Sequence, residues 1–321
     1  MRALQVTSLD GPDAVQVADV PEPTPNPGDV VVEVKAVGVS FPDLLLSRGE
    51  YQMKPEPPFQ LGVDFAGVVR SAPDGSGFAA GDRVACVLPW GGGAEVVALG
   101  ADSVFPLPDN VSFEAGAALP MNYLTAQFAL ATRAGLRQGE TVLVHGAAGG
   151  VGTATIQVAK GYGARTIAVV SSDEKAAVAK AAGADETVPV DGFLATVKEL
   201  TGGTGVDVVV DVVGGDLMTD SLRALAPLGR LLVVGFTAGS IPEVRVNRLL
   251  LNNVDVRGVG WGAYAMVRPG FMREQWDALV PMMESGVVDP PIGRTYGFEE
   301  MGAALTDMAE RRTLGKSVVV V

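Results

Sequence analysis

Six short apolar runs alternate with helical stretches in the middle of this chain, and this alternation restricts its fold more than any other feature. The runs are TVLVH (141–145), RTIAVV (165–170), DETVPV (185–190), VDVVVDV (206–212), RLLVVG (230–235) and VDVRGVG (254–260). Continuous apolar runs of this length are typical of parallel strands that helices cover on both faces. The alternation therefore predicts an α/β fold with a doubly wound parallel sheet made of two three-stranded halves.

The segments on either side of this alternation have a different pattern. Before residue 120, strand-like runs such as VVVEVKAVGV (30–39) are separated by turns rich in proline and glycine, which indicates a mostly β unit. Near the end of the chain, a helical stretch, a PPIG turn and a closing GKSVVVV strand leave the alternation again. We expect residues 1–120 and 265–321 to form one domain and residues 121–264 to form the other.

Charge and composition exclude several classes of partner. The 321 residues include 24 Lys and Arg against 37 Asp and Glu, a net charge of −13, and no basic cluster stands out. Such a charge repels nucleic acid and anionic membranes, so neither is an expected partner. The N-terminal sequence lacks the features of a signal peptide, and no apolar run approaches the roughly 20 residues that span a bilayer. We therefore expect a soluble, cytoplasmic protein. The one cysteine, Cys86, excludes an internal disulfide.

A glycine-rich corner, HGAAGGVG (145–152), joins the first apolar run to a helical stretch. Gly149 allows a pyrophosphate to approach backbone N–H groups at the helix N-terminus, and Gly152 allows the helix to pack closely on the strand. Ala147 stands where such motifs usually have their first glycine, which is tolerated if its φ is negative. The alternative is a tight turn without a ligand. We assign five residues to dinucleotide binding: Ala147, Gly149, Gly150, Val151 and Gly152.

The end of the second apolar run indicates which dinucleotide binds. An acidic side chain at this point would hold the ribose 2′-OH of NAD, but the chain has Ser171 and Ser172 there, with Lys175 one helical turn further on. Hydroxyls and a cation favour a 2′-phosphate, so we predict NADP. The alternative is structural, because Ser171 and Glu174 have the spacing of a capping box.

The motifs named so far belong to a resemblance that runs nearly end to end. The chain resembles the NADPH:quinone oxidoreductase family of zinc-independent medium-chain dehydrogenases/reductases, through the segments GVSFPDLLLSRGEYQ, PFQLGVDFAGVV, AALPMNYLTAQFAL, VLVHGAAGGVG, VDVVVDVVGG and RRTLGKSVVVV. The resemblance implies a GroES-like, mostly β catalytic domain and a Rossmann dinucleotide-binding domain, with the active site in the cleft between them.

Zinc-dependent members of the wider superfamily use a catalytic metal, and this chain lacks its ligands. By the resemblance, the ligand cysteine is replaced by Ser40, and the His-Glu pair is replaced by Val63 and Asp64. His145 is the only histidine in the chain. A zinc site needs about three nitrogen, sulfur or carboxylate ligands, so we expect no metal and the reduction of an acceptor that is already electrophilic.

The resemblance also implies which side chains serve the reaction. Tyr51 in GEYQ stands where the family has a tyrosine beside the nicotinamide, and we predict that it donates a hydrogen bond to the acceptor oxygen. The alternative is a half-buried surface tyrosine. Ser40 replaces the family's usual asparagine, and its hydroxyl can still bind cofactor or substrate. We expect Asp43 to orient the loop or cap a helix.

Further residues are assigned to the cofactor. Thr125 stands where relatives place a threonine near the nicotinamide carboxamide, although a helix-interior threonine is the alternative. The ends of parallel strands form ligand sites, which adds Gly235 and Phe236. Arg312 and Lys316 lie in the closing run that can approach the cofactor phosphates, and a solvated turn is the alternative.

The predicted function is the metal-free, NADPH-dependent reduction of quinones or related conjugated carbonyls by direct hydride transfer. Two alternatives stay open: an enoyl-CoA or enone reductase, and a non-catalytic, crystallin-like protein that binds NADPH. The expected partners are a small quinone or enone and a second copy of the chain. Because VDVRGVG (254–260) would lie at an open sheet edge, we expect a homodimer through this strand of the Rossmann domain.

Overall fold

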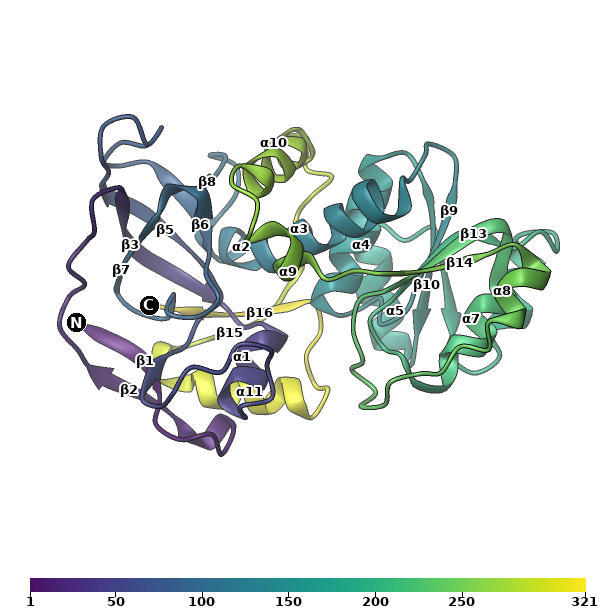
Figure 1. Cartoon of the computed structure of the whole chain (residues 1–321), viewed down its shortest axis with the longest axis horizontal. Helices are drawn as coiled ribbons and strands as arrows, with labels where there is room; N and C mark the ends of the chain where they lie inside the picture. Colours follow the sequence, from purple (N-terminus) through teal and green to yellow (C-terminus); the bar gives the residue numbers. More distant parts are fainter. The chain divides into compact units, whose positions relative to one another are not determined.

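The computed structural model describes residues 1–321 and divides into two units, shown in Figure 1. The first unit contains Met1–Met121, Met272–Trp276 and Ile292–Val321, and the second contains Asn122–Phe271 and Asp277–Pro291. The first change of unit thus comes one residue after the predicted one. The second differs more, because residues 265–271 and 277–291 pack with the second unit.

Side-chain contacts explain why the segment after residue 264 is divided in this way. Trp276, in helix α10 (Phe271–Glu284), is fully buried against Phe105 of the first unit. Its indole Nε1 donates to the backbone oxygen of Pro106 at 2.8 Å. Asp289 instead exchanges two hydrogen bonds with the side chain of Gln157 in the second unit. Sequence texture does not reveal such contacts, which join residues more than 100 positions apart.

The second unit is built on a parallel six-stranded sheet. Its strands are β9 (Thr141–Val144), β10 (Arg165–Val170), β11 (Glu186–Pro189), β12 (Val206–Asp211), β13 (Leu225–Val233) and β14 (Asp255–Gly258). They lie in the order β11-β10-β9-β12-β13-β14, and every neighbouring pair is parallel. This is the doubly wound order: β10 and β11 are added on one side of β9, and β12, β13 and β14 are added on the other. The predicted fold class is therefore confirmed.

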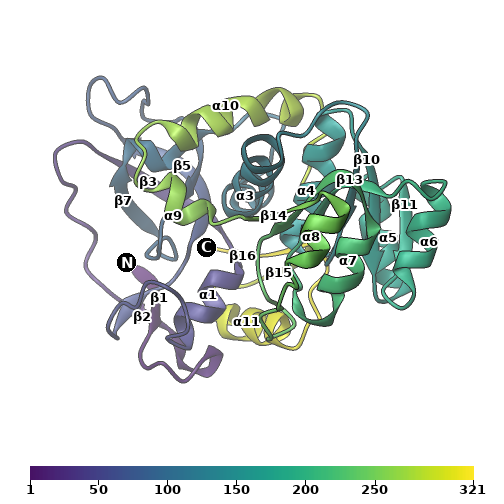
Figure 2. The ribbon, with the colours of Figure 1, turned by 45° about the vertical axis from the view of Figure 1, so that its right-hand side comes forward.

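Helices follow these strands, as the alternation predicts. They are α4 (Gly150–Gly161), α5 (Asp173–Ala181), α6 (Phe193–Leu200), α7 (Met218–Ala224), α8 (Asn247–Asn252) and α9 (Trp261–Ala265), and α3 (Pro120–Gln127) precedes β9. Figure 2 shows α5 and α6 beside β10 and β11. The Val, Leu and Ile side chains of the inner strands β9, β10 and β12 are buried, which requires helical cover on both faces of the sheet.

The first unit contains two mostly antiparallel sheets. The smaller sheet joins β1 (Arg2–Val6), β2 (Val15–Asp19) and β4 (Phe59–Gln60). The larger sheet joins β3 (Asp29–Gly38), β5 (Asp64–Ser71), β6 (Arg83–Val87), β7 (Val96–Gly100), β8 (Val104–Pro106), β15 (Ile292–Tyr296) and β16 (Lys316–Val320). The C-terminal strand β16 pairs with β3, so both ends of the chain contribute to this unit. Its helices are α1 (Phe41–Ser47), α2 (Phe113–Ala118) and α11 (Met301–Ala309).

The helices of the structure are all too short or too polar to form a membrane span.

Helix α2 lies so close to β3 that only a glycine fits between them. A Cβ atom on Gly38 would lie 2.1 Å from the backbone oxygen of Ala117, and a backbone atom cannot rotate away as a side chain can. We therefore predict that Gly38→Ala lowers the free energy of unfolding by about 1–3 kcal/mol. Urea unfolding measures this change.

The matched control is Gly100→Ala at the end of β7. Gly100 has an extended backbone with φ −63° and ψ 143°, and a Cβ atom there would meet no atom within 4 Å. This variant should be neutral or slightly stabilising. Equal stability of the two variants would contradict the close packing of α2 on β3.

Candidate active site

The glycine-rich corner has the geometry that a pyrophosphate requires. Gly149 is the N-cap of α4, a helix of 12 residues, and the first N–H groups of a helix have no partner within it. A Cβ atom on Gly152 would lie 2.2 Å from the oxygen of Gly146, so the helix packs directly on the turn that follows β9. Ala147 is buried and has no positive φ, which is the condition for alanine at this position. The corner therefore fits a dinucleotide.

One neighbour of this corner was missed by sequence reasoning. Asn122 is buried in the first turns of α3, and a Cβ atom on Gly150 would lie 2.5 Å from its side-chain nitrogen. A side chain at position 150 would therefore collide with the Asn122 amide, so Gly150 allows α3 to lie close to the start of α4. Asn122 lies in the segment AALPMNYLTAQFAL, whose polar side chains were the only available signal. Thr125 lies one turn further along α3 and is also buried.

The residues after β10 form one wall of a cavity of about 610 Å³ between the ends of β10 and β11. The ammonium of Lys175 donates to the hydroxyl of Ser171 at 3.1 Å; Ser171 is exposed and Lys175 is half-buried. Ser172 caps α5, because its hydroxyl accepts the N–H of Lys175 at 3.3 Å. The helix cap is therefore Ser172 and not Ser171. Ser171 lines the cavity, and its hydroxyl is left to bind the Lys175 ammonium.

A buried polar cluster lies in the first unit, and we call its four residues, Ser40, Asp43, Asp64 and Lys316, the serine–lysine cluster. The Ser40 hydroxyl donates to Asp64 Oδ2 at 2.6 Å. The Lys316 ammonium donates to Ser40 Oγ at 2.5 Å and to Asp64 Oδ2 at 3.0 Å. Asp64 Oδ1 accepts the N–H of Met121 at 2.8 Å. Side-chain exposure is 5% for Lys316 and zero for Asp64, so the ion pair is buried.

Asp43 belongs to the same cluster but serves the backbone. Its carboxyl accepts the N–H of Ser40 at 3.0 Å and the N–H of Gly62 at 3.1 Å, so it holds the start of α1 against the chain that precedes β5. This agrees with the loop-orienting role that the sequence suggested. Complete burial raises the pKa of Asp43 to about 7, and the charge of Asp64 acts in the same direction.

Tyr51 follows α1 and is half-buried near these carboxyls. Burial raises the pKa of its phenol, and the negative charges of Asp43 and Asp64 raise it further. The phenol therefore keeps its proton and can donate a hydrogen bond at neutral pH. Its placement beside a nicotinamide stays a prediction.

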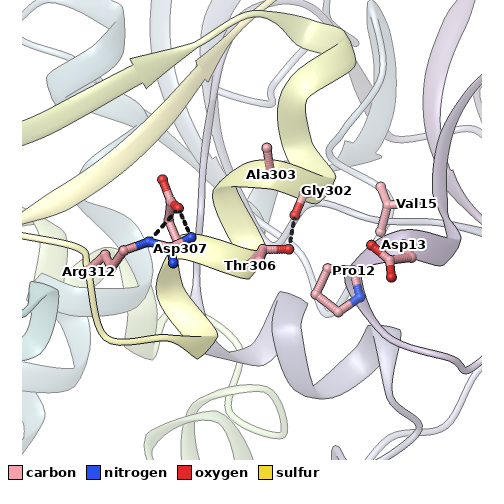
Figure 3. Close-up of a pocket in the computed structure, with 8 residues that line it drawn as sticks. All are labelled: Pro12, Asp13, Val15, Gly302, Ala303, Thr306, Asp307 and Arg312. Carbon is pink, nitrogen blue, oxygen red and sulfur yellow. Dashed lines mark hydrogen bonds and ion pairs between the residues drawn. The ribbon is translucent and has the colours of Figure 1, made fainter.

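The two basic residues of the closing run have different surroundings from those expected. Lys316 is not free to approach a phosphate, because its ammonium is buried and bound to Asp64 and Ser40. Arg312 forms ion pairs with Asp307 and Glu310. Figure 3 shows Arg312 and Asp307 beside a surface pocket of about 420 Å³ in the first unit. Its side chain is half exposed, and its role at the cofactor stays a prediction.

Strand ends of the second unit carry further polar groups. Asp211, at the end of β12, accepts the N–H groups of Val213 and Gly214 through Oδ1, and its buried Oδ2 has no partner. A Cβ atom on Gly214 would lie 2.9 Å from the Phe236 ring. His145 is buried, with Nε2 at 2.8 Å from Ser221 Oγ, and burial lowers its pKa to about 4. It is therefore neutral and packed in the core.

Comparison with known proteins gives the family. A model described as an alcohol dehydrogenase GroES-like domain matches residues 26–109, and one described as a zinc-binding dehydrogenase matches residues 150–285. The rat (Rattus norvegicus) quinone oxidoreductase-like protein 2 is 38% identical over 98% of this chain and 91% of its own length. The chain belongs to the quinone oxidoreductase family of medium-chain dehydrogenases/reductases. Membership makes it an oxidoreductase.

Solved structures of this family agree with the fold. A probable oxidoreductase of Mycobacterium abscessus has a TM-score of 0.92 and 45% identity, and the match covers 100% of this chain and 99% of that one. The Escherichia coli quinone oxidoreductase, solved in complex with NADPH, has a TM-score of 0.89 and 28% identity, with all of both chains covered. The resemblance that the sequence motifs indicated is confirmed.

One matching family model is described as a zinc-binding dehydrogenase, but the residues of this chain do not fit a catalytic zinc site. Ser40, Val63 and Asp64 stand at the positions where zinc-dependent relatives are expected to bind the metal. Val63 is buried and has no ligating atom, and the ammonium of Lys316 lies against the other two side chains. The chain contains no group of three or more His, Cys, Asp and Glu side chains arranged to hold a metal ion. A cation of the protein itself occupies this place.

The raised pKa of Asp43 predicts a pH dependence of stability. Since its pKa is about 7 in the folded protein and about 4 in the unfolded chain, the folded state binds the proton more tightly. Its contribution to the free energy of unfolding is therefore greatest below pH 4 and falls, by up to about 4 kcal/mol, as the pH rises to 7.

Urea unfolding at several pH values, with Asp43→Asn beside the wild type, measures this contribution. The variant cannot titrate at this position, so its unfolding free energy should fall less steeply between pH 4 and pH 7. Parallel curves for the two proteins would show that burial does not shift Asp43.

Proposed function

We propose that this protein reduces quinones, or related conjugated carbonyls, with NADPH as the hydride donor and without a metal. The observation that carries the proposal is the serine–lysine cluster, in which hydroxyl and ammonium groups stand where zinc-dependent relatives are expected to hold their metal. Membership of the quinone oxidoreductase family supports it. Without a Lewis acid to polarise it, the acceptor must itself be a strong electron sink, as a quinone is.

NADPH would lie across the carboxyl ends of the parallel strands. The N–H groups at the start of α4 would bind the pyrophosphate, because a helix N-terminus attracts anions. Ser171 and Lys175 would bind the 2′-phosphate at the cavity after β10. The bound nicotinamide supplies a hydride, which is the one step that no side chain of this protein can perform. Thr125, Gly235, Phe236 and Arg312 are further contacts in this proposal.

The acceptor would be held by hydrogen-bond donors of the first unit. Tyr51 keeps its phenolic proton, so it can stabilise the negative charge that develops on a carbonyl oxygen. Ser40 offers a second hydroxyl, whose hydrogen is donated to Asp64 in this structure and would turn to the acceptor oxygen. These two side chains orient the acceptor.

The proposal includes a homodimer. Strand β14 lies at the edge of the six-stranded sheet and pairs only with β13. An open edge is removed when the same strand of a second copy pairs with it. Several apolar side chains before it are exposed, including Leu250 and Leu251 of α8, which gives a second copy more apolar surface to cover.

The direct test is NADPH oxidation by the purified protein with a panel of quinones, enones and enoyl-CoA esters. We expect turnover with quinones, and a preference for NADPH over NADH of more than about tenfold in Kd, equivalent to about 1.4 kcal/mol. Tight NADPH binding without turnover on any acceptor would contradict the proposal and favour a non-catalytic NADPH-binding protein. A smaller preference would contradict the role of Ser171 and Lys175.

Replacement of Tyr51 separates the two classes of acceptor. A quinone spreads negative charge over its own ring, whereas an enone depends more on a hydrogen-bond donor at its oxygen. Tyr51→Phe should therefore lower kcat/KM for an enone by about 100-fold and that for a quinone by less than about tenfold.

The matched control is Tyr296→Phe, which removes a hydroxyl that donates to Asp307 elsewhere in the first unit. It should leave both rates unchanged. If Tyr51→Phe lowers both rates equally, Tyr51 does not act as the donor that distinguishes them.

A further inference from the structure

Reduction of a carbonyl acceptor requires a proton as well as a hydride, and Tyr51 is a poor source of it. Burial and the charges of Asp43 and Asp64 raise the pKa of the phenol, so Tyr51 donates a hydrogen bond but resists giving up its proton. The proton can instead come from a hydroxyl that is hydrogen-bonded to a cation, because the cation replaces the proton that the hydroxyl gives up. His145 is the only histidine, and it is neutral and buried in the second unit.

The serine–lysine cluster has the hydrogen-bonding capacity for this task. The Lys316 ammonium has three N–H groups and uses two of them, on Ser40 Oγ and Asp64 Oδ2. Ser40 Oγ donates its own hydrogen to Asp64 and accepts one from Lys316, which leaves one lone pair. A proton on Lys316 is thus one hydrogen bond away from the buried Ser40 hydroxyl.

Asp64 keeps this arrangement in place. Its two oxygens receive three donors, from Ser40, Lys316 and the N–H of Met121, so the carboxyl has little freedom to move. The carboxyls that face the ammonium are Asp64 of β5 and Asp43 of α1, and Tyr51 is the remaining titratable group near them. Buried polar atoms with unused capacity are costly unless a ligand or water completes them.

We propose that Lys316, acting through the Ser40 hydroxyl, supplies the proton that the acceptor oxygen takes up, and this inference rests on the proposed reductase function. When the acceptor gains a hydride, an electron pair moves onto its carbonyl oxygen. The Ser40 hydroxyl turns from Asp64 Oδ2 to that oxygen and gives up its hydrogen, and Ser40 Oγ takes a proton from Lys316, which also keeps its hydrogen bond to Asp64. Lys316 is left as a neutral amine beside Asp64, and a proton from water restores it. One hydride and one proton are thus consumed in each turnover.

In this scheme Lys316 is a positioning residue and Ser40 is the group that touches the acceptor. In zinc-dependent relatives a metal ion is expected to supply the positive charge at this position. Here the Lys316 ammonium supplies it, and the ammonium also carries a transferable proton. This gives the buried ammonium a role other than the phosphate contact that the sequence predicted.

Two variants separate the role of Lys316 in proton supply from a role in stability. Lys316→Met alone leaves Asp64 without its cation, so the variant can be unstable for a trivial reason. The double variant Lys316→Met with Asp64→Asn removes both charges and restores neutrality. We expect it to have a Tm close to that of the wild type and an unchanged Kd for NADPH. Its kcat with a quinone should fall by about 100-fold or more, with little change in KM.

A solvent deuterium isotope effect is the second measurement. If proton supply becomes rate-limiting, the effect on kcat should be larger in the double variant than in the wild type. The control is Arg230→Met with Glu140→Gln, which removes a largely buried ion pair in the second unit. It should retain the wild-type kcat and isotope effect.

Ser40→Ala keeps the inference testable if the double variant does not fold. It removes the hydroxyl and leaves the pair of Lys316 and Asp64, and its kcat should fall to a similar extent. Wild-type kcat in either variant would overturn the inference. A loss of NADPH affinity without a loss of kcat would also overturn it, in favour of a cofactor-binding role. A wild-type protein that binds NADPH but reduces no acceptor would defeat the proposed function itself, and the inference with it.

Discussion

The buried ion pair between Lys316 and Asp64 is the interaction on which the first unit depends. It joins the last strand of the chain to β5, and through Ser40 it also fixes the start of α1. Burial of two charges is costly, and the cost is offset only where the geometry and the other hydrogen bonds are good. Here Asp64 accepts three donors, so both of its oxygens are satisfied. A pair of this kind stabilises little overall, but removal of one partner leaves an uncompensated buried charge.

The parallel sheet could be predicted from the sequence because its signal is local. Buried strands must be apolar on both faces, and β10 begins and ends at the predicted residues, Arg165 and Val170. The predicted run at 230 is the exception, since β13 already begins at Leu225. The segment LAPLG interrupts the apolar pattern with a proline and a glycine, and Leu228 there has a positive φ of 66°. Only Leu225 of this segment pairs with β12, and the register shifts before Arg230, so the start of β13 is irregular and its regular pairing begins at the predicted residue.

The candidate site was predicted less completely because its contacts are long-range. The glycine corner and the Ser171 region are single segments whose chemistry is visible in a few adjacent residues. Lys316 is 252 positions from Asp64 and 276 from Ser40, so no spacing rule connects them. A lysine in an exposed-looking RRTLGK run was therefore assigned to phosphates. Asn122 was not predicted for the same reason, because its position depends on a close contact with Gly150, a residue without a side chain.

A crystal structure of the protein with NADPH and a quinone, grown in a zinc-containing solution, would show whether a hydroxyl and an ammonium of this chain replace a metal at the acceptor. We expect Lys316 Nζ to stay hydrogen-bonded to Ser40 and the quinone oxygen to lie within about 3.2 Å of the Ser40 or Tyr51 hydroxyl. A zinc ion between Ser40 and Asp64, or a quinone bound away from both hydroxyls, would show that these side chains do not replace a metal.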